Sequence, residues 1–258
     1  MKKILIIGLA LAAFGFTSCE YDNYEAPSLV ISGNMVYEGE NLPFDGNPAR
    51  TVLRVVQSGF GKVDAGTAIQ VAADGSFTQL LFGGKYSLTP YNNPYPFVFP
   101  DYPYMGESEG YPTTDIDLQT NLRMDIEVIP YYVLSEFKAW YEDGQIKMSC
   151  QIATVNDEGG LVTDANRPAL AKVRGYVSTS RIVNSATTCT KTWSGWLPNY
   201  QGESTMDIPV KDYQTGYTNN YRSYAYCRMA IELGNIPDYY LFTPVVKVEG
   251  LPVKEWNN

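Results

Sequence analysis

Short runs of alternating apolar and polar residues recur along this chain. The alternation is clearest at 145–152 and at 224–231, where apolar residues occupy every second position. A period of two is typical of β-strands with one buried face. Further strands are expected at 29–37, 51–56, 68–71, 77–82, 85–88, 114–118, 122–129 and 244–248. No apolar period of 3.6 persists for a dozen residues, so we predict an all-β protein of two β-sandwiches.

The alternation also indicates which side chains face the core. Cys150 and Cys227 fall on the apolar positions of their strands, whereas Tyr224, Tyr226 and Arg228 fall on the opposite face. For the last three we expect a structural stacking role rather than a binding role. The two cysteines lie on strands that could face each other, and an oxidising compartment permits a Cys150–Cys227 disulfide. Two buried free thiols, packed as small hydrophobes, are the alternative.

The first residues have the pattern of a secretion signal. Two lysines precede an apolar run at 4–13, and small residues at 17–18 lead to Cys19. This order is typical of a cleaved signal peptide. A cysteine at the cleavage point resembles the acylated first residue of bacterial lipoproteins. We therefore expect residues 1–18 to be removed, Cys19 to carry a lipid anchor, and 19–27 to form an acidic tether.

The tether also indicates a location. The run 20–25 holds three carboxylates and resembles the export signal of surface lipoproteins in Gram-negative bacteria with Sus-type uptake systems. That resemblance implies a lipid-anchored protein of the outer membrane that faces the cell exterior. A plain solvated tether is the alternative, because acidic and polar residues suit both.

Composition narrows the chemistry. The net charge of −9 argues against nucleic-acid binding, which relies on basic side chains that face phosphates. The chain has no histidine, which removes the commonest general base and most zinc sites. Its 21 tyrosines suit β-strands. We expect no catalysis, no metal and no cofactor.

Two sets of motifs resemble known sandwich families. The segments 33–36, 74–77 and 84–88 read GNMV, DGSF and GKYSL, and they are similar to the carboxypeptidase-regulatory, or transthyretin-like, domain. The segments 224–229 and 239–248 resemble the last two strands of a fibronectin type III or Ig-like sandwich. The first resemblance implies a domain without catalytic activity.

Together with the signal at Cys19, these motifs resemble the two-domain "domain of unknown function" lipoproteins encoded beside SusC/SusD transporter pairs. The resemblance implies a transthyretin-like domain at 28–131 and a fibronectin/Ig-like domain at 132–258. It also implies a cell-surface accessory of a SusC/SusD-type importer that helps to capture nutrients, most often glycans. It transfers no binding residues to this chain.

An aromatic segment at 91–104 is the first candidate sugar site. Its prolines exclude a central strand, so its rings are expected on a loop. Exposed rings stack on the apolar faces of sugars, while amides and carboxylates bond the hydroxyls. Packing of the rings onto either sandwich and contact with a transporter are the alternatives. The residues proposed to bind are Tyr95, Tyr102, Tyr104, Asn92, Asn93 and Asp101.

A tryptophan segment at 192–200 is the second candidate. Trp193, Trp196 and Tyr200 surround a turn that contains glycine and proline. The two indole rings either flank a sugar, or fill the core and its rim. Our hypothesis is therefore non-catalytic capture of an oligosaccharide by aromatic stacking. The alternative is a protein-docking module of the transporter complex that has no ligand of its own.

Overall fold

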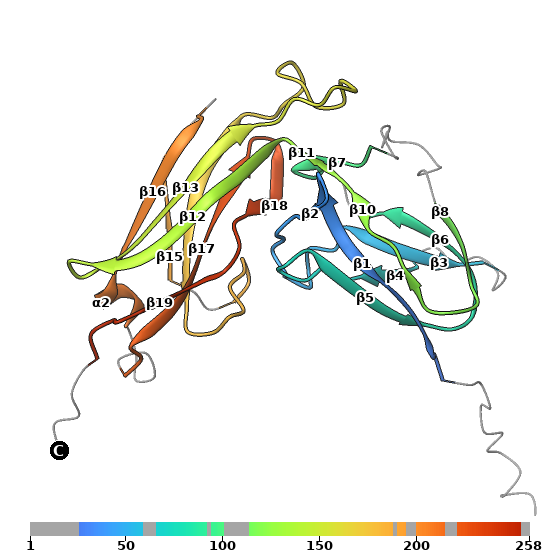
Figure 1. Ribbon diagram of the computed structural model, residues 1–258, viewed down its shortest axis with the longest axis horizontal. Coiled ribbons are helices and arrows are strands. Elements are labelled where there is room, and N and C mark those ends of the chain that lie inside the picture. The colour runs from blue at the N-terminus through green and yellow to red at the C-terminus, as the bar shows by residue number, and fades with distance from the viewer. Residues whose placement is uncertain are drawn as a thin grey trace, which may run out of the picture.

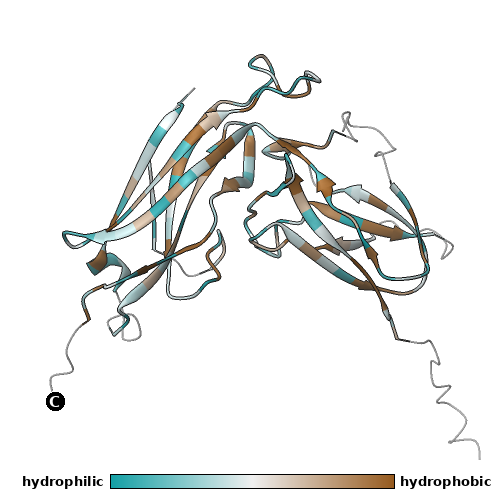
Figure 2. Ribbon diagram, viewed as in Figure 1, coloured by the Kyte–Doolittle hydropathy of each residue, from teal (hydrophilic) through white to brown (hydrophobic). Residues whose placement is uncertain are grey.

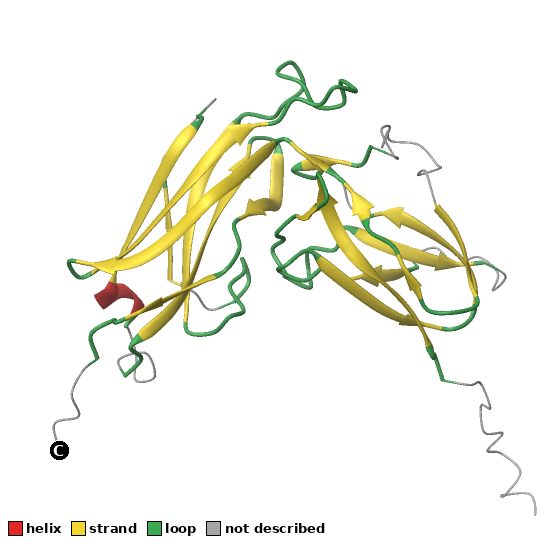
Figure 3. Cartoon of the chain, in the orientation of Figure 1, coloured by secondary structure: helices red, strands yellow, loops and turns green. Residues whose placement is uncertain are grey.

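The computed structural model describes residues 26–58, 66–91, 94–100, 114–187, 190–194, 200–214 and 221–253. The regular secondary structure of these residues is almost entirely β-strand, with one short helix, α2 (Val210–Tyr213) (Figure 3). The all-β prediction is confirmed. Figure 1 shows two lobes beside each other, one formed by each half of the chain.

The N-terminal half holds two larger sheets and one short pair. The first sheet is centred on β1 (Leu29–Tyr37), which pairs with β2 (Glu40–Asn41), β5 (Ser76–Leu81), β9 (Leu122–Arg123) and β10 (Ile126–Glu127). The second sheet has the order β4 (Thr67–Ile69), β3 (Leu53–Gln57), β6 (Gly84–Pro90) and β8 (Thr114–Leu118). The short pair is formed by β7 (Phe97–Val98) and β11 (Ile129–Pro130).

The C-terminal half holds a three-stranded and a five-stranded sheet. The first has the order β12 (Tyr132–Glu142), β13 (Gln145–Thr154) and β16 (Gly202–Pro209). The second has the order β15 (Thr190–Trp193), β14 (Leu170–Ser178), β17 (Tyr224–Leu233) and β18 (Ile236–Phe242), and β19 (Val246–Glu249) also pairs with β17. The two sheets pack face to face. Their close contact is seen at Gly175 of β14, where an added Cβ would lie 2.8 Å from the Met148 side chain of β13.

The predicted strand at 122–129 is divided into β9, β10 and β11, and side chains explain the breaks. The Asp125 carboxylate accepts hydrogen bonds from the Asn34 backbone (2.8 Å) and side-chain amide (2.9 Å). The Asp125 side chain thus takes the place of a main-chain acceptor for the Asn34 amide between β9 and β10. At the same place a Cβ on Gly33 would lie 1.7 Å from the Met124 carbonyl oxygen. The close approach of the two backbones therefore requires the glycine of the GNMV motif.

The DGSF motif forms the tight turn that precedes and enters β5. Gly75 has a φ of +83°, and a Cβ there would lie 2.4 Å from the Leu42 carbonyl oxygen. Only glycine adopts this conformation without strain and leaves room for the neighbouring backbone. Asp74 accepts hydrogen bonds from the Ser76 hydroxyl (2.7 Å) and amide (3.1 Å), which holds its carboxylate in a fixed place on the turn.

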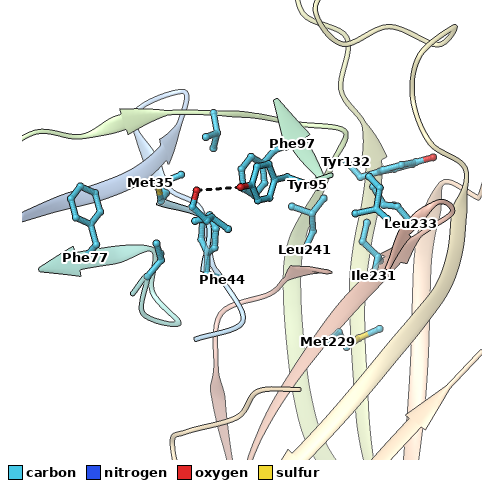
Figure 4. Close-up of a cluster of buried hydrophobic side chains, with 14 of the residues drawn as sticks. Met35, Phe44, Phe77, Tyr95, Phe97, Tyr132, Met229, Ile231, Leu233 and Leu241 are labelled. Atoms are coloured by element: carbon cyan, nitrogen blue, oxygen red, sulfur yellow. Dashed lines mark hydrogen bonds between the residues drawn. The ribbon is translucent and has the colours of Figure 1, made fainter. Parts of the chain in front are cut away.

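One apolar core runs through both halves. Apolar positions alternate with polar ones along the strands (Figure 2), and most of the buried apolar side chains form one cluster that includes Met35 of β1 and Ile231 of β17. A second, small cluster lies within the C-terminal half and holds Tyr176, Val183, Ala230 and Phe242. Figure 4 shows Tyr95 and Phe97 between Phe44 on one side and Leu241 on the other. No sheet contains strands from both sides of the boundary between β11 and β12, whereas the apolar core extends across this boundary. The boundary at 131/132 and the named sandwich types therefore stay predictions.

Polar bonds also join the halves. The buried Asp45 carboxylate accepts a hydrogen bond from the Ser185 amide (2.7 Å) and a further one from its hydroxyl. Arg50 forms an ion pair with Asp238 at 2.7 Å. The Tyr239 hydroxyl donates to the Thr51 carbonyl at 3.2 Å. Both apolar and polar contacts thus fix the junction.

Candidate functional site

The aromatic segment does not form the predicted stacking platform at Tyr95. This ring is only 4% exposed, stacks on Phe97 at 5.3 Å, and meets Tyr239 edge-on at 5.4 Å. Its assignment as a ligand-binding residue is therefore wrong, because packing between the halves removes it from solvent. The packing alternative is correct for Tyr95. The other residues proposed there, Asn92, Asn93, Asp101, Tyr102 and Tyr104, lie outside the described residues.

The tryptophan segment is described only at its edges. The Trp193 backbone belongs to β15 and pairs with Arg174, but its side chain and all of Trp196 lie outside the described residues. Tyr200 is half-buried, packs against the core, and donates a hydrogen bond to the Glu203 carbonyl. A sugar site at 192–200 stays a prediction.

Cys150 and Cys227 both face the core, as the alternation predicts, and both are free thiols. The disulfide between them is absent from the structure, which has the alternative of two buried small side chains. Burial raises the pKa of each thiol to about 12. Neither is positioned as a nucleophile, because the thiolate is the reactive form.

The opposite face of β17 is a stacking surface, and Arg228 lies buried beneath a loop. Its guanidinium lies 4.1 Å above the Phe242 ring and donates to the Val183 (3.0 Å) and Thr243 (3.1 Å) carbonyls. Burial lowers the pKa of Arg228 to about 9, although the Asp45 carboxylate opposes this shift. Arg228 thus holds the loop that carries Val183 against the sheet.

The neighbouring tyrosines on this face also stack on one another and on cations. The Tyr224 and Tyr226 rings meet edge-on at 5.8 Å, and the Lys247 ammonium lies 4.8 Å above the Tyr224 ring. Both rings are half-buried. These contacts supply the structural role that the sequence predicts for them.

A hollow lies at the junction of the two halves and is lined by residues from both. Its volume is about 500 Å³, within the range of small-molecule sites, which favour domain junctions. Alanine and proline make up half of the residues that line it. The residues that line it are Asn41, Pro43, Ala72, Ala73, Asp74, Arg181, Pro244 and Val245.

Two charged groups face this hollow from opposite halves. The Ser76 hydroxyl and amide hold the pKa of Asp74 below its usual value, so the carboxylate is ionised at neutral pH. Both bonds go to Oδ1, which leaves Oδ2 available to a ligand. Arg181 is exposed and forms no ion pair with any described residue. A carboxylate acceptor and a guanidinium donor therefore border one hollow.

A second, smaller hollow adjoins the first and shares Asn41 and Pro43 with it. Its volume is about 170 Å³. The half-exposed Tyr37 ring lines this second hollow. Burial is the main cause that raises the pKa of its phenol to about 12, and the hydrogen bond with Glu38 is the second cause. The hydroxyl of Tyr37 is therefore protonated at neutral pH and donates a hydrogen bond to the Glu38 carboxylate.

Sequence reasoning missed this site for two different reasons. Asp74 was visible only as part of a turn motif, which predicts structure rather than binding. Arg181 belongs to the irregular segment after β14, where no periodicity or motif marks it. The junction exists only because residues 41–74 and 181–245 meet in space, and no local pattern reports that meeting.

The described residues lack both a metal-binding cluster and a membrane-spanning helix. They contain no group of three His, Cys, Asp or Glu side chains placed to hold a metal ion. None of their helices is long and apolar enough to cross a membrane. Asp74 and Arg181, which line one hollow without an ion pair between them, are suited to hydrogen bonding of a polar ligand.

Comparison with known proteins finds a family model that matches the first half of the chain, and solved structures that share the fold of nearly all of it. Residues 29–129 match the model of the protein of unknown function (DUF3823) N-terminal domain. No curated protein matches the chain in sequence.

Solved structures resemble nearly the whole chain. A DUF3823 protein from Parabacteroides merdae is 19% identical with a TM-score of 0.66, over 87% of this chain and 100% of its own. A DUF3823 protein from Bacteroides uniformis is 16% identical with a TM-score of 0.67, over 88% of this chain and 100% of its own.

A third structure, from Bacteroides uniformis, is named as a candidate carbohydrate binding protein; it is 14% identical with a TM-score of 0.61, over 87% of this chain and 100% of its own. At these identities the likeness shows the fold alone. Residues 29–129 therefore match the model of the DUF3823 N-terminal domain, and the chain as a whole shares the fold of solved DUF3823 proteins.

Proposed function

We propose that this protein is a cell-surface lipoprotein that captures an oligosaccharide without catalysis, as an accessory of a SusC/SusD-type importer. The observation that carries the proposal is the junction hollow, which Asp74 and Arg181 line from opposite halves of the chain. Asn41 adds an amide to the same wall.

The chemistry of this hollow suits a sugar. Vicinal hydroxyls donate to a carboxylate oxygen and accept from a guanidinium, and charge-assisted hydrogen bonds are stronger than neutral ones. The half-exposed Tyr37 ring in the adjoining hollow offers an apolar face for a neighbouring sugar unit. A chain of sugars that follows both hollows would cross from the larger to the smaller at Asn41.

The absence of catalysis is part of the proposal. Glycoside hydrolysis by the common mechanisms uses two carboxylates that flank one bond. Among the described residues that line the larger hollow, Asp74 is the one carboxylate. The similar fold named as a candidate carbohydrate binding protein supports the same class of function.

The lipid anchor and the outer-membrane location rest on the sequence around Cys19. The order of charged, apolar and small residues before this cysteine supports acylation. The acidic run that follows supports export to the cell surface.

Affinity electrophoresis of the chain that begins at Glu20, against a panel of polysaccharides, tests the binding proposal. One polysaccharide should retard the protein, and Arg181→Ala should abolish most of the retardation, because it removes the guanidinium donor from the wall of the hollow. Arg181 is exposed and forms no ion pair with a described residue, so the substitution should not disturb the fold. Lys138→Ala is the matched control, since Lys138 is an exposed cation of β12 outside the hollow.

Two further variants separate the junction from the aromatic segments. Trp196→Ala and Tyr102→Ala should leave retardation unchanged if the sugar lies in the hollow. Loss of binding in these variants but not in Arg181→Ala would move the site to the aromatic and tryptophan segments. No retardation by any polysaccharide would favour the docking module, and co-purification with the transporter would then test that function.

A further inference from the structure

Two large apolar side chains are exposed at the end of the N-terminal half where the chain enters it. Leu80 of β5 is 50% exposed, and Phe82, just after β5, is 45% exposed. Leu80 lies opposite Val30 of β1 in the strand register. Val30 alternates with the fully buried Ile31, so it points to the outer face of the sheet with Leu80. We call Val30, Leu80 and Phe82 the apolar patch.

The patch lies where the N-terminal tether joins the fold. The Ser28 amide donates to the Leu81 carbonyl at 3.2 Å, so the chain enters between the two exposed residues of the patch. Figure 1 shows that β1 begins at the end of its lobe that points away from the C-terminal half. Any anchor upstream of Ser28 is therefore attached at this end.

The length of the tether keeps the patch close to the anchor. Nine residue steps separate Cys19 from Ser28, and even a fully extended chain of this length reaches only about 30 Å. A lipid on Cys19 would thus hold the apolar patch within one short tether of the membrane surface. Tethering of this kind raises the effective concentration of a weak second contact.

The small size of the patch favours a lipid surface over a protein partner. A stable protein interface buries roughly 800 Å² on each side, which needs many more side chains than the patch provides. A lipid interface accepts a few apolar side chains as a second signal beside a covalent chain. Arg123 of β9 is paired with Ser32 on the same outer face, and it adds a cation that anionic headgroups attract.

We propose that Leu80 and Phe82, with Val30, rest on the membrane surface to which Cys19 is anchored. This inference depends on the acylation of Cys19 in the proposed function, but not on glycan binding. The contact would orient the molecule, with the N-terminal half on the lipid and the junction hollow raised above it.

Photolabelling of the acylated full chain tests the contact. The protein is reconstituted in vesicles of phosphatidylcholine and phosphatidylglycerol that contain a phospholipid with a photoreactive acyl chain, and labelled peptides are mapped by mass spectrometry. Labelling at 76–82 should exceed labelling at Ile182 several-fold. Ile182 is the internal control, because it is even more exposed, at 63%, but lies in the C-terminal half.

Paired substitutions give the second readout. Leu80→Glu with Phe82→Glu should reduce labelling of 76–82 several-fold, whereas Ile182→Glu should not change it. Thermal unfolding checks that the double variant is folded; if it is not, the ratio in the unchanged chain decides alone. Equal labelling at both places overturns the inference.

The two proposals fail in distinguishable ways. Mass spectrometry of the mature N-terminus shows whether Cys19 carries a lipid. An unmodified Cys19 overturns both the anchor and the membrane contact. An acylated Cys19 without labelling at 76–82 overturns the contact alone and leaves the lipoprotein proposal standing.

Discussion

At the scale of single residues, burial determines what each reactive group does. The two described cysteines lie in the core with their thiols protonated, and Arg228 lies beneath a loop with its guanidinium bonded to carbonyls. By contrast, Asp74 and Arg181 are exposed at one hollow. Of these charged and reactive groups, only Asp74 and Arg181 are therefore exposed and able to bind a ligand.

The free thiols give the first residue-scale prediction. In a chain that begins at Glu20 and carries Cys189→Ser, Cys150 and Cys227 should resist a thiol-reactive reagent in the native state and react fully after unfolding without reductant. Burial raises the pKa of both thiols to about 12, and the thiolate is the reactive species. Cys150→Ala and Cys227→Ala should each lose half of the reaction. An unfolded chain that does not react would reveal the disulfide and contradict the structure.

The raised pKa values of Cys150 and Cys227 also determine how the free energy of unfolding changes with pH. Between the ordinary thiol value of 9.0 and about 12, the unfolded thiols ionise while the folded ones stay protonated. The folded state then binds more protons than the unfolded state, so these thiols lower the free energy of unfolding as pH rises through this window.

At the scale of elements, the strands follow the sequence pattern, and turns fix their ends. The predicted strands at 29–37 and 114–118 coincide with β1 and β8. Most others differ by a residue or two at their ends. The segment 122–129 was predicted as one strand, and its apolar residues do alternate with charged ones. However, Asp125 bonds Asn34 and interrupts the ladder. That interaction joins residues 91 positions apart, and no local pattern predicts it.

The turn glycines give a prediction at this scale. Gly75→Ala should lower the free energy of unfolding by more than about 2 kcal/mol, through left-handed strain and a clash with Leu42. Gly39→Ala is a matched control: its φ of +80° nearly equals the +83° of Gly75, but a Cβ there meets nothing within 4 Å. We expect it to cost about 1 kcal/mol, from strain alone. Urea unfolding measures both, and equal losses would refute a role for the Leu42 contact.

At the scale of the whole molecule, the junction between the halves organises both the core and the candidate site. Tyr95 was predicted to bind sugar and instead packs against Tyr239 of the other half. The fold class and most strands of the N-terminal half could be predicted from periodicity, whereas β12, β14, β15 and β16 of the C-terminal half were not predicted. The junction hollow could not, because it arises from packing of segments that are distant in sequence.

The polar bonds of the junction give the third prediction. Asp45→Ala removes a buried carboxylate that accepts from the Ser185 amide and hydroxyl, and we expect a loss of about 2–3 kcal/mol. Arg50→Met removes the partly exposed pair with Asp238 and keeps the apolar stem, so its cost should stay below about 1 kcal/mol. Hydrogen exchange at Ser185 should accelerate in the first variant only. The reverse order of effects would mean that the exposed pair holds the junction.

The stacked rings at this junction also bear on how the molecule can be dissected. A cut between β11 and β12 respects every strand pairing, but it would uncover Tyr95 on one fragment and Tyr239 on the other. Each fragment would then expose an aromatic surface that the intact chain keeps dry. The natural unit for expression, transfer between proteins and exchange in evolution is therefore the pair of lobes, and not either lobe by itself.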